Sequence, residues 1–188
     1  MDEDDPSKGY PEPTIRGPRI GASASARRLL ERVETPFFMF AADDVIFRTP
    51  GWDRKFVKAM PEDQLAVLWP YSASRNKCFH CFTSMTWHKL VEVYPDKFRH
   101  FGADGWIVHV AELCNRLISV DAVVEHMHYK FGKSKEDATY TEARQGGAAG
   151  EAHAYLESTK DVRKQHAGII LKAIDEFRQT GRDHRPAA

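Results

Sequence analysis

The sequence predicts a single α/β domain in which helices cover a β-sheet. Hydrophobic patterns typical of helices and of strands alternate along the chain, and this order is typical of layered α/β folds. A chain of 188 residues with 42% hydrophobic content can bury one sizeable core but not two. We expect a flexible leader at 1–20, because proline and charge dominate there, then the α/β domain at 21–146 and a helical extension at 147–188.

The first half of the chain should contain two helices and two strands. Ser23 or Ser25 could cap the first helix, and Pro36 follows it. The apolar run that begins at Pro36 ends at Asp43 and Asp44, as expected for a strand buried on both faces. The expected elements are a helix after Gly21, a strand from 36, a helix at 53–60 with Phe56, Val57 and Met60 on one side, and a strand at 64–71.

The second half should contain further strands and helices in the same alternation. The long apolar stretch before Asn115 has helical spacing, whereas the one after it alternates as a strand does. The expected elements are a short strand at 78–82, helices at 84–94 and 103–114, a long strand at 116–128, and a terminal helix at 153–178 that breaks near 166–168.

Charge and composition exclude several classes of partner. Lys plus Arg and Asp plus Glu number 27 each, so the chain lacks the basic excess typical of nucleic-acid binding. No run approaches the roughly 20 apolar residues of a membrane span, and the acidic, proline-containing N-terminus differs from a signal peptide. We therefore expect a cytoplasmic protein whose three cysteines are free thiols.

Asp43 and Asp44 are the first candidate ligands. Open α/β sheets bind their ligands at the carboxyl ends of strands, which is where this pair is expected. Carboxylate oxygens suit Mg²⁺ or Mn²⁺, and such an ion can bridge to a diphosphate. The alternative is that both aspartates only end a strand and cap a turn.

His126 and His128 are the second candidate pair. In a strand, side chains two residues apart point to the same face, so both imidazoles can share one site. Imidazole is a common ligand of transition metals. The alternative is a pair of exposed histidines at a strand end.

Three segments resemble one enzyme family. The segment PFFMFAADDVIFRTPGWD resembles the central strand and D-x-D region of family-2-type GT-A glycosyltransferases, notably the short ones of phage and bacterial genomes. FGADGWIVHVAE resembles the segment that holds their catalytic acidic residue, and VVEHMHYKFGKSKEDATY resembles the late strand and loop that bring a histidine to the metal. The resemblance covers roughly residues 17–144 and implies a Rossmann-like mixed sheet flanked by helices.

The resemblance implies a metal-dependent glycosyltransferase that moves a sugar from a UDP- or GDP-sugar to a hydroxyl of a sugar, glycan or protein. Asp44, with Asp43, would hold Mn²⁺ or Mg²⁺ on the diphosphate, and His126 or His128 would complete the metal shell. Asp104 would act as the base that takes the acceptor proton.

Two of these assignments have plainer alternatives. Asp104 could be a helix N-cap, since aspartate is favoured there. Lys133 could approach the phosphates, or could belong with Lys130 and Lys135 to a solvated loop. Trp52 and Trp106 could stack on a sugar or pack in the core.

The chain departs from the family at its beginning and at two motif positions. The opening strands of complete GT-A enzymes have no counterpart before Ile20, so the chain resembles an N-terminally truncated member, and a homo-oligomer or a complementary N-terminal chain is a possible partner. Ala42 stands where a strict D-x-D has its first aspartate, and ADG at 103–105 lacks a second acidic residue.

Two other functions remain open. The first is a noncatalytic carbohydrate-binding or assembly relative of the same fold. The second is a zinc-stabilised binding module, suggested by Cys78, His80, Cys81 and His88, although Cys-x-His-Cys spacing suits a tetrahedral site poorly.

Overall fold

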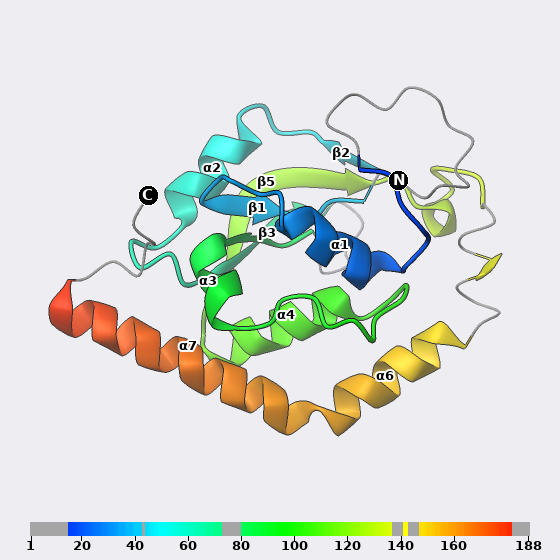
Figure 1. Ribbon diagram of the computed structural model, residues 1–188. Coiled ribbons are helices and arrows are strands. Elements are labelled where there is room, and N and C mark those ends of the chain that lie inside the picture. Colours follow the sequence, from blue (N-terminus) through cyan, green and yellow to red (C-terminus); the bar gives the residue numbers. More distant parts are fainter. Residues whose placement is uncertain (1–14, 43, 73–79, 137–140, 143–146, 182–188) are drawn as a thin grey trace.

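A mixed five-stranded sheet with helices on both faces forms the centre of the molecule (Figure 1). The computed structural model describes residues 15–42, 44–72, 80–136, 141–142 and 147–181, so the expected leader lies largely outside the described residues. The strand order is β1-β4-β3-β5-β2, in which β3 and β5 are parallel and the other neighbours are antiparallel. This confirms the α/β class, whereas the GT-A assignment stays a prediction.

The observed elements follow the expected order, with shifted ends. The strands are β1 (Phe37–Met39), β2 (Val45–Phe47), β3 (Val67–Ser72), β4 (Phe82–Ser84) and β5 (Leu117–His126). The helices are α1 (Ala22–Leu30), α2 (Trp52–Ala59), α3 (Met85–Leu90), α4 (Ala103–Leu113), α6 (Ala148–Ser158) and α7 (Lys160–Thr180), with a 3₁₀ turn η1 (Tyr129–Phe131).

The apolar run from Pro36 does not form one central strand as expected. It splits into β1 and β2, which lie at opposite edges of the sheet. β1 pairs with β4, whereas β2 pairs with β5 through Val45 opposite His126. The strand prediction was wrong because hydrophobic composition alone does not show that the chain crosses from one edge of the sheet to the other between the two segments.

Two helix boundaries also differ from expectation. Gly21, not Ser23 or Ser25, is the N-cap of α1, and it has a φ of 91°. A side chain at Gly21 would approach the Arg99 backbone to 3.0 Å, which explains the need for glycine. The terminal helix breaks at Thr159, where Arg163 donates to the Leu156 carbonyl across the bend, and α7 continues through 166–168.

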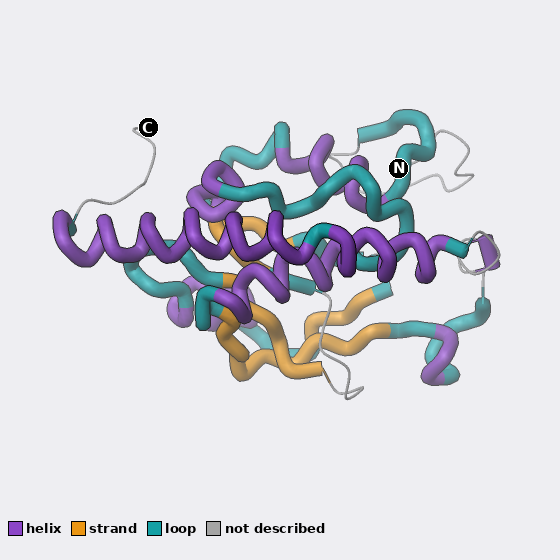
Figure 2. The backbone as a smooth tube through the Cα atoms, turned by 90° about the horizontal axis from the view of Figure 1, so that it is seen from below, coloured by secondary structure: helices purple, strands orange, loops and turns teal. Residues whose placement is uncertain are grey.

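Hydrophobic side chains fill both faces of the sheet. In β3, Val67 packs into the cluster shared with α1, α3, α4 and α7, whereas the next residue, Leu68, packs with Phe56 of α2. All three are fully buried. Val57, which was expected beside Phe56, is instead 49% exposed. Figure 2 shows α6 and α7 following one another along one side of the molecule.

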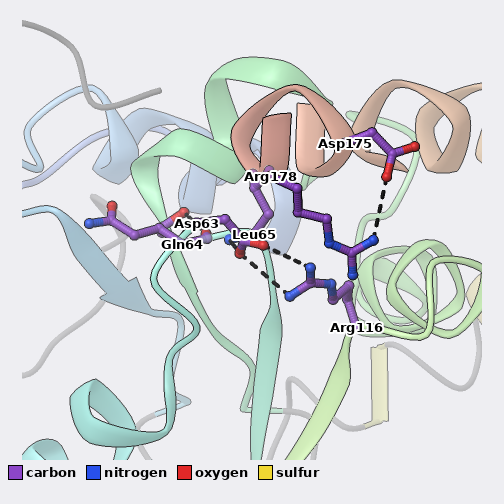
Figure 3. Close-up of polar contacts among 7 residues, drawn as sticks. Asp63, Gln64, Leu65, Arg116, Asp175 and Arg178 are labelled. Atoms are coloured by element: carbon purple, nitrogen blue, oxygen red, sulfur yellow. Dashed lines mark hydrogen bonds and ion pairs between the residues drawn. The ribbon is translucent and has the colours of Figure 1, made fainter. Parts of the chain in front are cut away.

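An ion pair joins the starts of the two parallel strands (Figure 3). Arg116 Nη2 donates to Asp63 Oδ2 at 2.7 Å, and the side chains are only 16% and 7% exposed. Asp63 also accepts from the Leu65 N–H at 2.9 Å, and the Val67 N–H donates to the Arg116 carbonyl at 2.9 Å. These contacts hold β3 and β5 in register at their N-terminal end.

Candidate functional site

Asp44 and His126 meet at the opposite end of the parallel strands. Asp44 precedes β2, and its carbonyl accepts the Met127 N–H at 2.7 Å, which places it beside the end of β5. Its Oδ2 lies 2.9 Å from Nε2 of His126, and the two side chains are 20% and 19% exposed. The structure therefore joins two of the residues singled out in the sequence, 82 positions apart.

Two more imidazoles flank this pair. The His80 and His128 rings lie 5.7 Å and 5.1 Å from the His126 ring, both nearly edge-on. His128 lies beyond β5, at the N-cap of η1, and its Nδ1 accepts the Lys130 N–H at 3.1 Å. The expected proximity of His126 and His128 is confirmed. No pattern in the sequence indicates that His80 lies beside them.

Burial keeps His80 neutral. Its residue is only 3% exposed, and this burial, together with nearby His126, lowers the pKa of His80 to about 4. One ring nitrogen donates to the Phe40 carbonyl, which with Asp44 opposes the shift. Nε2 is buried and has no hydrogen-bond partner within the described part of the chain. Burial and His126 also lower the pKa of His128.

Asp104 lies in the first turn of α4 but is not the N-cap, so that alternative was wrong. Gly102 is the N-cap, with a φ of 98° that favours glycine. Burial raises the pKa of Asp104, against hydrogen bonds from the backbone of Gly105, Asp104 and Gly102. A raised pKa makes a carboxylate a better proton acceptor near neutral pH.

Asp104 lies near Tyr94, whose ring packs against Phe40. Burial, with Cys81 and Asp104 nearby, raises the pKa of Tyr94. The Tyr94 ring lies 5.6 Å from the Phe40 ring, and the Phe40 carbonyl accepts from His80. Phe40 thus contacts both Tyr94 and His80 of the histidine cluster, which consists of His80, His126 and His128.

Lys133 forms an ion pair rather than remaining in solvent. Its Nζ lies 2.6 Å from Glu125 Oε1, and Arg48 bonds to Oε2 at 2.6 Å through Nε. The Lys133 hydrogen bond, then that of Arg48, lowers the pKa of Glu125. Because Glu125 and His126 are consecutive in a strand, their side chains point to opposite faces. The phosphate contact of Lys133 stays a prediction.

Several expected residues do not join a site. Asp43 and Cys78 lie outside the described residues. Cys81 and Cys114 are buried free thiols, and among the described residues no three His, Cys, Asp or Glu side chains already have the arrangement of a metal site. Trp106 is 1% exposed and packs against Phe98 and Tyr155, which confirms a core role.

Trp52 also packs against neighbouring aromatic residues. Its ring stacks on Phe47 at 3.9 Å and meets Phe56 edge-on at 6.1 Å. These contacts account for Trp52 as part of the α2 side of the core.

A cavity of about 390 Å³ lies elsewhere, between β1, α2 and the end of α7. Its lining includes Phe37, Met60 and Phe177, and none of its lining residues belongs to the histidine cluster.

No helix in the described part of the chain is both long and apolar enough to cross a membrane.

The chain matches no family model, no curated protein and no solved structure.

Proposed function

We propose that this protein is a metal-dependent glycosyltransferase that uses a nucleotide-diphosphate sugar as donor. The contact between Asp44 and His126 carries the proposal, because it joins a carboxylate and an imidazole from two neighbouring strands at the carboxyl end of the β3–β5 pair. That end is where α/β sheets bind their ligands. The resemblance of the segments around Asp44, Asp104 and His126 supplies the reaction class.

The donor set fits a divalent cation of borderline hardness. Asp44 offers carboxylate oxygen and His126 offers imidazole nitrogen, and both are partly exposed. Mn²⁺ and Mg²⁺ are the ions that the family resemblance implies. A divalent ion held there would offset the charge that develops on the departing nucleoside diphosphate.

Asp104 is the proposed general base. It would take the proton from an acceptor hydroxyl as that oxygen bonds to the anomeric carbon and the bond from this carbon to the diphosphate breaks. The raised pKa of Asp104 supports this role, because it makes the carboxylate a better proton acceptor near neutral pH.

Calorimetric titration of UDP and GDP into the full chain tests the proposal. With Mn²⁺ or Mg²⁺ present, we expect saturable binding that is lost in Asp44→Ala and on adding a chelator. Asp175→Ala is the matched control, because that carboxylate lies on the exposed side of α7 in an ion pair with Arg178. UDP or GDP binding that persists both in the presence of chelator and in Asp44→Ala would contradict the proposal.

One observation favours a noncatalytic relative as the second candidate. Asp44 and His126 bond directly to one another at 2.9 Å, an arrangement that needs no ion and that a carbohydrate-binding relative could retain. The two candidates differ in donor hydrolysis: an enzyme should slowly release UDP or GDP from its nucleotide sugar in the presence of metal, and Asp104→Asn should abolish the release. A binding protein should release none.

A further inference from the structure

His80 is a buried polar residue whose Nε2 has no hydrogen-bond partner in the described part of the chain. It precedes β4, and its ring lies 5.7 Å from that of His126. Only 3% of the residue is exposed to solvent. A buried polar atom without a partner costs stability, so such an atom in a native protein points to a water, an ion or a ligand.

The protonation state of His80 suits a metal ligand. One ring nitrogen carries the proton and donates to the Phe40 carbonyl, which leaves the lone pair on Nε2. A carbonyl that holds the other nitrogen of an imidazole is the usual outer-shell partner of a metal-binding histidine, because it fixes the tautomer and the ring orientation. The tautomer of His80 is therefore the one that a nitrogen ligand needs.

The ring spacing fits two imidazoles on one ion. A metal–nitrogen bond of about 2.1 Å places each ring centre roughly 3 Å from the ion, so two ligands at a tetrahedral angle have ring centres roughly 5 to 6 Å apart. The observed His80–His126 distance of 5.7 Å falls in this range. The bond between His126 and Asp44 would be exchanged for bonds from both side chains to the ion.

We propose that Nε2 of His80 is a ligand of the ion held by Asp44 and His126, so that the site selects transition metals such as Co²⁺ or Zn²⁺ over Mg²⁺. The inference rests on the metal site of the proposed function and specifies which ions that site takes. Two imidazoles and one carboxylate disfavour Mg²⁺, which prefers oxygen ligands and retains its water. For such a set, affinity should rise from Mn²⁺ to Co²⁺.

The test is Co²⁺ titration of the full chain, followed by visible absorption and by calorimetry. We expect saturable binding that a 100-fold excess of Mg²⁺ does not displace, and His80→Gln should weaken it on the order of tenfold or more, as expected for a lost ligand. His88→Gln is the matched control, because His88 also has a buried nitrogen without a partner in the described part of the chain but packs against Phe38, away from the cluster. That variant should bind Co²⁺ as the wild type does.

Proton NMR of the Co²⁺-loaded protein gives an independent count of ligands. Each ligated imidazole with a protonated second nitrogen should give one strongly shifted exchangeable N–H signal, and His80→Gln should remove one of them. Equal Co²⁺ affinity in wild type and His80→Gln would overturn the inference and leave His80 with a bound water only. If His80-dependent Co²⁺ binding is found but UDP and GDP do not bind, the inference stands and the proposed glycosyltransferase function fails.

Discussion

The polar groups at the two ends of the parallel strands β3 and β5 differ in how fully they are paired. At the N-terminal end, Asp63 and Arg116 are buried as a complementary ion pair, and Asp63 also accepts a backbone N–H. At the C-terminal end, Asp44 bonds to His126, and the His80 and His128 rings lie beside the His126 ring. Nε2 of His80 is buried without a partner among the described residues, and this difference between the two ends supports the proposal that the C-terminal end binds a ligand.

The largest expected effect on the free energy of unfolding is at the N-terminal end of β3 and β5, where the polar groups are paired. Asp63→Ala should lower the free energy of unfolding by about 3 kcal/mol, because it leaves the mostly buried Arg116 without its counter-charge. Equilibrium urea unfolding, followed by circular dichroism, measures the change. The effect should be the same with and without divalent metal.

Asp175→Ala is the control for this change, because Figure 3 shows a second Asp–Arg pair nearby, between Asp175 and Arg178. Both of its side chains are more than 60% exposed, so its removal should cost no more than about 0.5 kcal/mol. If both variants lost the same free energy of unfolding, burial would not account for a larger contribution of the Asp63–Arg116 pair.

Acid should destabilise the folded protein through His80, which lies at the C-terminal end of β3 and β5. The pKa of His80 is about 4 in the folded chain, against 6.5 when exposed, so between these values the unfolded state binds more protons. Stability should therefore fall as the pH drops from 6.5 to 4, by roughly 3 kcal/mol if His80 alone accounts for the change. Urea unfolding across this range in chelator measures it.

His80→Gln provides the comparison for the acid effect. Glutamine keeps a polar side chain but does not titrate, so its unfolding free energy should change less over the same range. A variant as acid-sensitive as the wild type would assign the effect to other groups.

The sequence was sufficient for elements whose pattern is local. The spacing of Ile107, Ala111 and Cys114 predicts a helix, and α4 is found within one residue of the expected ends. The strand expected at 116–128 is also found as β5, although it ends two residues early, at His126, and its pairing brings His126 to Asp44. Local periodicity reports directly on which side of an element is buried.

The sequence was not sufficient where contacts join distant segments. The run from Pro36 predicts one strand because both β1 and β2 are apolar, and only their partners β4 and β5 reveal two edges. In the sequence, His80 stands out only as a neighbour of Cys81 in the candidate zinc site. Its position next to His126 depends on how the start of β4 lies against the end of β5, which no spacing within the chain encodes.

A smaller loss of stability is expected when Ser84 is replaced. This residue lies near the N-terminal end of β3. Its Oγ accepts the Trp87 N–H at 2.9 Å as the N-cap of α3 and donates to the Gln64 carbonyl at 2.6 Å. Ser84→Ala should lower the free energy of unfolding by about 1 kcal/mol. Ser158→Ala, which removes an exposed hydroxyl contact at the end of α6, should change it by less than half as much. Matching losses would mean that the cap does not add to the stability of this end.

The smallest expected change in stability is at Asp44. Asn has nearly the same shape and can still bond to His126, so Asp44→Asn should shift the free energy of unfolding by about 0.5 kcal/mol at most. Metal-dependent binding of UDP or GDP should nevertheless be lost, because the variant no longer carries the anionic ligand. Urea unfolding and calorimetry on the same preparation measure both quantities. A large loss of stability with binding retained would reverse the comparison, because it would make the Asp44–His126 contact a structural clamp like Asp63–Arg116.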